Sequence, residues 1–357
     1  MKVAIITYTD ANNPGAQLQA YALQETVSRI AGEKCYQIDH RKFDDKIFSK
    51  ISGLGSIFRN VYYLIGYSQR KKRNLHYDFY RKNILNLTEP SHTDEKRRLL
   101  NMQFDAFITG SDQVWNCQKG LYSPFYLDFV EEGKLKFAYS ASMGKIDVPS
   151  KYQQDFTKAI SDFDAISVRE KQVAEYLEEN FDVNATVTCD PVFLLKKEEW
   201  SQAIRNAETV SKDDYIFVFT TEINDHMISV LKNIRRKTQY TVISTRAIPG
   251  VKTTVRLDIG PLEFVKYIAN SKMVVTNSFH ATAFSIIFQK DFYTVPHTSR
   301  ASRLVSLLSL LDIEERLIFE TNENLDLQSI DYDSVNAKLE QYVFESISYL
   351  KKCLNKS

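Results

Sequence analysis

One polar segment of the chain, residues 110–116 (GSDQVWN), follows an apolar run and offers side chains that could bind or activate a hydroxyl group. Asp112 can accept a proton from a sugar hydroxyl or hydrogen-bond it, and Ser111 and Gln113 supply further polar contacts. A capped helix start, with Ser111 or Asp112 as the N-cap, explains the same residues. The spacing alone leaves both interpretations open.

A second polar cluster lies in the segment TNSFHATAFSIIF, directly after the apolar run MVVT. Asn277, Ser278 and His280 crowd an expected strand-to-helix junction, where folds with parallel sheets gather their ligands. Histidine titrates near neutrality and can act as an acid, a base or an anion partner. The competing interpretation is a histidine buried and satisfied within the core.

Three arginines could hold an anion. Arg169 ends the strand-like run ISV, and Arg300 and Arg303 are spaced one helical turn apart. Guanidinium groups make planar, bidentate contacts to carboxylate and phosphate, so this set would suit a doubly anionic ligand. Ordinary surface ion pairs, such as one between Arg169 and Glu170, are the alternative.

A glycine-containing loop separates the first expected strand from the first expected helix. It carries Asn13, Gly15 and Gln17, and a glycine at a helix N-terminus frees backbone N–H groups for an anion. Neither G-x-G-x-x-G nor G-x-x-x-x-G-K-[ST] occurs near it. A structural turn is an equally good explanation of this loop.

The elements that must position these residues alternate between strand and helix. The pattern restarts near residue 200, which predicts two Rossmann-like α/β domains, 1–198 and 199–357, facing each other across a central cleft. In such folds a last helix can cross back to the first domain. Strands are expected at 3–8, 107–109, 136–142, 165–168, 185–188, 215–220, 241–244, 273–276 and 292–295, and helices at 16–30, 171–180, 223–236, 262–270 and 333–353.

The composition excludes several classes of protein. Lys and Arg total 46 against 45 Asp and Glu, so the net charge of +1 argues against a general polyanion binder, and no nucleic-acid motif is present. No run approaches 18 apolar residues, and the N-terminus lacks signal-peptide features, so we expect a cytoplasmic protein without a spanning helix. The four cysteines form no C-x-x-C pair and are expected to be reduced thiols, and no metal-ligand spacing occurs.

Residues 41–98 differ from the rest of the chain, because they hold 14 Lys and Arg against 6 Asp and Glu. Within them, residues 47–73 mix aromatic and aliphatic side chains with basic ones. One interpretation is a helical insertion packed on the first domain with a solvated basic face. The other is an interfacial segment that meets an anionic membrane surface or a polyprenyl-diphosphate substrate.

Taken in chain order, these motifs resemble the polysaccharide pyruvyl transferase family. The matching segments are NNPGAQLQAYALQ, ITGSDQVWN, FAYSASMG, ISVRE, TCDPVFLL, VVTNSFHATAFSIIF and SRASRLVSLL. The resemblance implies a fold similar to GT-B glycosyltransferases. It also implies transfer of a pyruvyl group from phosphoenolpyruvate to a sugar of a surface polysaccharide or its lipid-linked precursor, with a ketal formed and phosphate released. No cofactor or metal is expected beyond the donor itself.

The resemblance assigns roles residue by residue. His280 matches the family histidine associated with phosphoenolpyruvate, and we expect it to be the general acid or the phosphate partner. Many members carry an arginine shortly before this histidine, where this chain has Ser278 and Phe279. Asp112 is the expected general base or acceptor anchor. The remaining candidate substrate contacts are Arg169, Arg300, Arg303, Asn277, Ser278, Ser111, Gln113, Asn13, Gly15 and Gln17.

Two other functions fit the same chain. A GT-B-type glycosyltransferase would use a nucleotide sugar in a similar fold, and a non-catalytic relative would bind carbohydrate without turnover. The missing arginine before His280 favours the second of these. The expected acceptor is a soluble sugar or a polyprenyl-diphosphate-linked oligosaccharide, the latter at the inner face of the cytoplasmic membrane.

Overall fold

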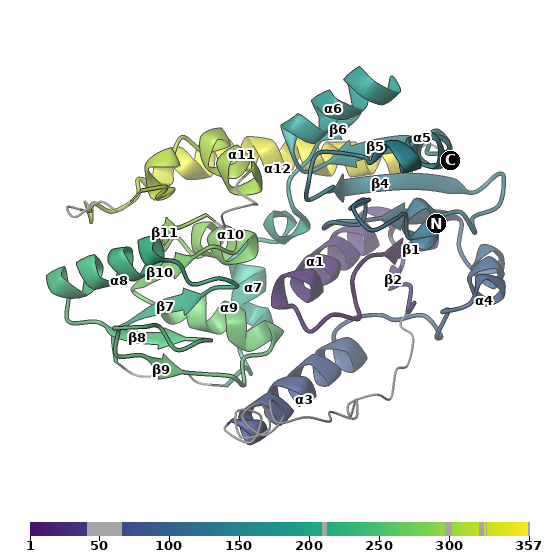
Figure 1. Ribbon diagram of the computed structural model, residues 1–357. Coiled ribbons are helices and arrows are strands. Elements are labelled where there is room, and N and C mark those ends of the chain that lie inside the picture. The colour runs from purple at the N-terminus through teal and green to yellow at the C-terminus, as the bar shows by residue number, and fades with distance from the viewer. Residues whose placement is uncertain (41–65, 209–212, 297–301, 321–324, 326, 356–357) are drawn as a thin grey trace, which may run out of the picture.

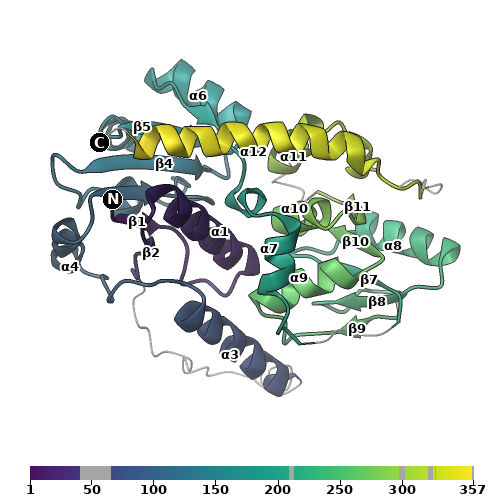
Figure 2. The same ribbon diagram turned by 180° about the vertical axis from the view of Figure 1, so that it is seen from behind.

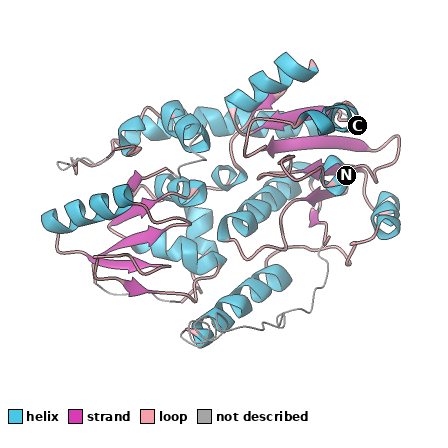
Figure 3. Ribbon diagram, viewed as in Figure 1, coloured by secondary structure: helices cyan, strands magenta, loops and turns pink. Residues whose placement is uncertain are grey.

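The computed structural model describes residues 1–40, 66–208, 213–296, 302–320, 325 and 327–355. Two parallel sheets follow one another along the chain, and helices cover both (Figure 3). Arg300 and most of the 47–73 segment lie outside the described residues.

The first domain is built on a six-stranded parallel sheet with strand order β2-β1-β3-β4-β5-β6. Four of the five connections between consecutive strands contain an α-helix, the usual crossover between parallel strands. The elements of this domain are β1 (Val3–Ile6), α1 (Pro14–Ala31), β2 (Tyr36–Gln37), α3 (Tyr67–Asn83), α4 (Asp94–Arg98), η1 (Leu99–Met102), β3 (Ala106–Thr109), η2 (Ser123–Tyr126), β4 (Leu135–Ala141), η3 (Ser150–Tyr152), α5 (Gln153–Ile160), β5 (Ala165–Val168), α6 (Lys171–Phe181), β6 (Thr186–Val187) and η4 (Pro191–Leu194).

The second domain repeats the pattern on a five-stranded parallel sheet with strand order β11-β10-β7-β8-β9. Its central strands β7 and β10 are short, apolar runs that are buried on both faces, as expected of parallel sheets covered by helices. The elements are α7 (Lys197–Ala203), β7 (Tyr215–Phe219), α8 (Asp225–Lys237), β8 (Thr241–Ser244), β9 (Thr254–Val255), α9 (Pro261–Asn270), β10 (Met273–Thr276), α10 (Phe279–Ile287), β11 (Asp291–Thr294), α11 (Ser302–Leu310), η5 (Glu314–Arg316) and α12 (Tyr332–Leu354).

Helix α1 shows how local sequence sets an element that the site uses. The Asn13 side chain accepts a hydrogen bond from the backbone N–H of Gly15 at 3.0 Å, and Pro14 occupies the first turn. Gly32, with φ of 67°, ends the helix in the left-handed conformation. The cap therefore fixes where α1 begins, and Gly15 lies in its first turn.

The two sheets share one continuous hydrophobic core, which α1, α7, α9 and α10 fill between them. Trp200 of α7 is fully buried there, and its indole N–H donates to the carbonyl of Val192 at 3.0 Å. The ring makes edge contacts with Tyr21 of the first domain and Phe284 of the second, with centroids 5.8 and 4.9 Å apart. The domains are thus packed together and not merely linked.

Helix α12 lies along both domains, as the two opposite views show (Figures 1 and 2). Near its start, the Tyr332 hydroxyl donates to the Lys290 carbonyl of the second domain at 2.5 Å. Farther along, Ser346 Oγ accepts from the Cys189 N–H at 2.9 Å, and the Tyr349 hydroxyl donates to the Ala138 carbonyl at 3.0 Å. The helix therefore forms hydrogen bonds with both domains.

Helix α3, the described part of the basic insertion, contacts the second domain as well as the first. Lys72 Nζ lies 2.5 Å from Glu208 and 3.7 Å from Asp258, and His76 Nδ1 lies 3.1 Å from Glu263. The sequence predicted a helical insertion that packs on the first domain, and this prediction is incomplete. Acidic residues of the second domain also attract one face of this basic helix.

Two further features concern the whole of the described chain. None of its helices is long and apolar enough to cross a membrane. All four cysteines, Cys35, Cys117, Cys189 and Cys353, are buried free thiols.

Candidate functional site

Polar side chains from both domains meet where three strands of the first sheet end. Asp112, Arg169 and Asp190 follow β3, β5 and β6, and the carboxyl ends of these parallel strands share one edge of the sheet. The second domain contributes His280 from the first turn of α10 and Arg303 from the first turn of α11. We call this group of five residues the junction site.

Arg169 is the centre of the junction site and is almost fully buried. Its Nη1 lies 2.6 Å from Asp190 Oδ2, and its Nε lies 3.4 Å from Glu170 Oε1. Its guanidinium also lies over the Phe279 ring, 4.7 Å from the ring centroid. Burial alone would lower the pKa of Arg169, but the Glu170, Asp190 and Asp112 carboxylates raise it above its ordinary value. The side chain is therefore a permanent cation.

Asp190 lies between Arg169 and His280 and connects the two domains. The His280 Nε2 atom is 3.5 Å from Asp190 Oδ2, while Asp190 Oδ1 accepts from the Val192 N–H at 3.1 Å. Burial would raise the pKa of Asp190, but the neighbouring His280 and Arg169 side chains lower it below its ordinary value. Asp190 is therefore ionised and can orient the imidazole.

Gly15 touches His280 directly. A Cβ atom at Gly15 would lie 2.1 Å from Nδ1 and 2.4 Å from Cγ of the imidazole, which no side chain can occupy. The start of α1 thus forms one wall of the histidine's environment, and only glycine allows this approach. Gly15 was a candidate ligand contact by sequence; the structure brings it against the candidate catalytic histidine.

The loop after β3 is irregular and contains no helix, so the capped-helix interpretation of residues 110–116 is wrong. Asp112 has φ of 68°, and its backbone pairs with β4 by accepting from the Ser142 N–H at 2.9 Å. Its Oδ1 lies 3.6 Å from Arg169 Nη2 and 4.0 Å from Arg303 Nη1. Asp112 is therefore held between one arginine from each domain.

Gln113 joins the same group through Arg303. With its amide oxygen turned toward the guanidinium, Gln113 accepts from Nη2 at 3.1 Å and from Nη1 at 3.3 Å. Arg303 and Asp112 keep 15% and 13% of their side-chain surfaces exposed, whereas Arg169 keeps 3%. Solvent and ligands therefore reach the Arg303–Asp112 side of the junction site first.

The other sequence candidates support the loops around the junction site. Gln17 donates to the carbonyls of Thr9 and Ala11 at 2.8 and 3.0 Å and so folds the loop before α1. Ser111 is buried and donates to the Ser140 carbonyl at 2.6 Å. Asn277 ties β10 to the loop after β7, where its Oδ1 accepts from the Thr221 N–H at 3.0 Å, and Ser278 caps α10.

Sequence reasoning missed Asp190, although its segment TCDPVFLL was part of the family resemblance. An aspartate before proline is also the common start of a short helical turn, and Asp190 does cap η4. The signal that could have found it is position, because it follows a strand at the same sheet edge as Asp112 and Arg169. Glu170 was considered only as a surface partner of Arg169. In the structure it is buried, and its Oε1 accepts a hydrogen bond from Ser142 Oγ at 2.7 Å.

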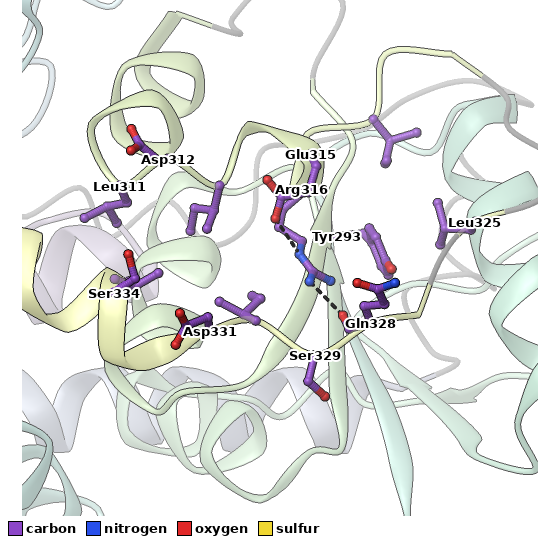
Figure 4. A pocket seen from close by; sticks show the side chains of 14 residues that line it. Tyr293, Leu311, Asp312, Glu315, Arg316, Leu325, Gln328, Ser329, Asp331 and Ser334 are labelled. Atoms are coloured by element: carbon purple, nitrogen blue, oxygen red, sulfur yellow. Dashed lines mark hydrogen bonds and ion pairs between the residues drawn. The ribbon is translucent and has the colours of Figure 1, made fainter.

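A cavity of about 570 Å³ lies elsewhere, at the edge of the second sheet between β11, η5 and the start of α12 (Figure 4). Arg316 lines it and donates to the Gln328 carbonyl at 2.7 Å. None of the five junction-site residues lines this cavity. Across the described residues, no three His, Cys, Asp or Glu side chains are grouped as metal ligands.

Comparison with known protein families shows to which family the chain belongs. The model of the family described as polysaccharide pyruvyl transferase matches residues 13–299. The chain belongs to the polysaccharide pyruvyl transferase family. The match covers the start of α1, Asp112, Arg169, Asp190 and His280 and confirms the family resemblance, while Arg303 and nearly all of the segment SRASRLVSLL lie beyond it. Membership assigns polysaccharide pyruvyl transfer as the general activity.

Solved structures confirm the fold. A putative UDP-N-acetylglucosamine 2-epimerase from Listeria monocytogenes is 9% identical with a TM-score of 0.50, over 99% of this chain and 90% of that chain. S. aureus MnaA, in a co-structure with UDP, is 10% identical with a TM-score of 0.51, over 100% and 91%. These likenesses show an α/β fold of two Rossmann-like domains of the GT-B type. The search of curated proteins finds no match.

Proposed function

We propose that the protein transfers the pyruvyl group of phosphoenolpyruvate to two hydroxyls of one sugar residue, forming a ketal and releasing phosphate. One observation carries this proposal: two buried nitrogens of the junction site, Arg169 Nη2 and His280 Nε2, make no hydrogen bond among the described residues and reach Asp112 and Asp190 only as longer ion pairs, at 3.6 and 3.5 Å. Buried donors are nearly always satisfied, so two unmet donors at one place favour an anionic ligand. Phosphoenolpyruvate brings a carboxylate and a phosphate.

The donor anions would be shared between the arginines of the two domains. Arg169 Nη2 points toward Asp112 from the buried side, and Arg303 approaches the same carboxylate from the more exposed side. A ligand anion near these guanidiniums gains from their low-dielectric surroundings. Many family members carry an arginine shortly before the histidine, where this chain has Ser278 and Phe279, and Arg169 lies over the Phe279 ring. Arg169 is thus placed to supply the missing cation.

The chemistry then needs one acid and one base. Protonation of the methylene carbon of phosphoenolpyruvate by His280 gives a cation at the central carbon, which a sugar hydroxyl attacks. Asp112 accepts the proton of that hydroxyl. Loss of phosphate regenerates the cation, and attack by the second hydroxyl, with loss of its proton, closes the ketal. Asp190 would hold the His280 imidazole in the correct orientation.

The test is release of phosphate that depends on both phosphoenolpyruvate and a sugar acceptor. Replacing His280 by Ala is expected to lower the rate by roughly 10²–10⁴-fold, the usual contribution of a general acid. Replacing Arg303 by Ala should raise the KM for phosphoenolpyruvate, because it removes one anion contact. Arg235→Ala, an exposed arginine at the end of α8, is the matched control. Unchanged turnover in both site variants would contradict the assignment.

Donor binding separates this proposal from its two rivals. Phosphoenolpyruvate should raise the melting temperature of the wild-type protein, while UDP- and GDP-sugars should not. Stabilisation by nucleotide sugars alone would instead support a glycosyltransferase. Sugar binding in titration calorimetry without any donor binding would support a non-catalytic carbohydrate-binding role. A panel of soluble and polyprenyl-diphosphate-linked acceptors, followed by mass spectrometry, would identify the acceptor.

A further inference from the structure

The outward face of α3 gathers large apolar side chains in contact with solvent. Tyr67, Leu75 and Phe79 keep 59, 58 and 56% of their surfaces exposed, and no other described helix exposes three such residues. At 100° per residue these three positions fall within one 120° arc of the helix. A stripe of this kind on one side of a helix usually marks an interaction surface.

The same arc carries two lysines, Lys71 and Lys82, both exposed. The other basic residues of α3 are turned toward the protein: Lys72 forms ion pairs with Glu208 and Asp258 of the second domain. Arg81 is buried and pairs with Asp78 at 2.9 Å, so the one acidic residue of the helix is neutralised. The outward arc therefore combines three apolar side chains and two lysines with one carboxylate, Asp78, which is paired with Arg81.

We propose that this surface, the α3 outer face (Tyr67, Lys71, Leu75, Phe79 and Lys82), rests on an anionic lipid surface. Aromatic and leucine side chains gain by entering the boundary between headgroups and acyl chains, and lysines beside them reach the lipid phosphates. Interleaved cations favour headgroups over an apolar protein groove, because such a groove would have to desolvate both ammonium groups. Of the basic residues 70–73, only Lys71 belongs to this face, and Lys72 instead pairs with Glu208 of the second domain.

The position of α3 connects this surface to the junction site. Asn12 donates to Asn74 Oδ1 of α3 at 3.0 Å and accepts from Arg81 at 3.0 Å. The same loop continues into Gly15, which touches His280. A protein resting on α3 would therefore hold the candidate catalytic histidine close to the bilayer. This consequence rests on the proposed function, and it favours a lipid-linked acceptor over a soluble one.

The experiment is flotation of the full chain with vesicles of phosphatidylcholine alone or with added phosphatidylglycerol. We expect binding only to the anionic vesicles, weakened by salt. Lys71→Gln with Lys82→Gln should weaken it about 25-fold, since each lysine near an anionic surface contributes roughly fivefold. Tyr67→Ser with Leu75→Ser and Phe79→Ser should abolish it. The matched control is Phe344→Ser with Lys351→Gln and Lys352→Gln, which removes an exposed aromatic and two exposed lysines from α12.

Each outcome decides the question. No flotation of the wild-type protein, or equal flotation of the α3 variants and the control, would overturn the proposal. Dimers in light scattering that only the α3 variants lose would assign the face to a second copy instead. Phosphate release with a soluble acceptor should persist in the α3 variants, and His280→Ala should still float. Flotation without pyruvyl transfer would thus refute only the proposed function, and transfer without flotation only this inference.

Discussion

Among the ion pairs that join the two domains, those at the junction site and those on α3 differ in burial. At the junction site, Asp190 and His280 keep 0 and 8% of their side-chain surfaces exposed. On α3, Lys72 and its partner Glu208 keep 40 and 47% exposed. Exposed pairs contribute little to stability because water screens them, whereas breaking a buried pair leaves an uncompensated charge. The junction site is therefore both the stronger tie and the less tolerant of change.

The largest effect is expected from Asp190→Asn. The substitution keeps the shape of the side chain but leaves the buried Arg169 guanidinium without its closest carboxylate. We expect a loss of about 3–5 kcal/mol in the free energy of unfolding, measured in urea. Glu208→Gln, which removes an exposed interdomain carboxylate, is the matched control and should cost less than about 1 kcal/mol. Equal losses in the two variants would remove the distinction between the two places.

The pH dependence of the same variant checks the cause. The pKa of Asp190 is lowered in the folded protein, so its ionisation stabilises the fold above the unfolded pKa of about 3.9. That contribution is lost as the pH falls through the lower, folded-state pKa. The stability difference between wild type and Asp190→Asn should therefore stay constant from neutral pH to about 5 and shrink below about 4. If the stability difference between wild type and Asp190→Asn did not change below pH 4, ionised Asp190 would be excluded as its cause.

The next effect is that of Gly15→Ala, which tests the close contact at the junction site. In a helix without a clash, alanine is about 1 kcal/mol more favourable than glycine. Here the new Cβ would overlap the His280 ring, so we expect the opposite sign, a loss of about 1–3 kcal/mol, together with loss of turnover. Adding Gly15→Ala to the His280→Ala variant should stabilise it, since the ring is gone. A stabilising Gly15→Ala in the wild-type background would show that the domains are not packed this closely.

The smallest effect is expected on α3. Lys72→Met removes the ion pairs to Glu208 and Asp258 at a cost of about 0–1 kcal/mol, and the cost should vanish in 1 M salt. Thermal unfolding at low and high salt measures it. The loss caused by Asp190→Asn should persist at both salt concentrations, because salt does not reach a buried pair. A salt-independent loss for Lys72→Met would place that pair among the buried ones.

The same contrast explains what the sequence could predict. Apolar runs located most of the strands closely, with β8 and β10 at their expected residues, because a buried strand needs little but local composition, whereas β2 and β9 were not expected. Asp112 and Arg169 each follow a strand of the first parallel sheet, and they lie near each other because the carboxyl ends of these strands share one edge. The contact of Gly15 with His280 and the pairing of Lys72 depend on how the domains pack, and no local pattern encodes this. Asp190 was missed because its local role as a cap concealed its long-range one.

The hydrogen bond from the Cys189 amide to Ser346 has a consequence for biosynthesis. A ribosome releases the first sheet well before it makes α12, and domains generally fold in order of emergence. Here the backbone at the last strand of that sheet finds its acceptor only on α12, after the second domain has emerged. The nascent first domain therefore lacks the Ser346 acceptor for this amide until α12 has been synthesised. The first domain gains this hydrogen bond only after the whole sheet of the second domain has emerged.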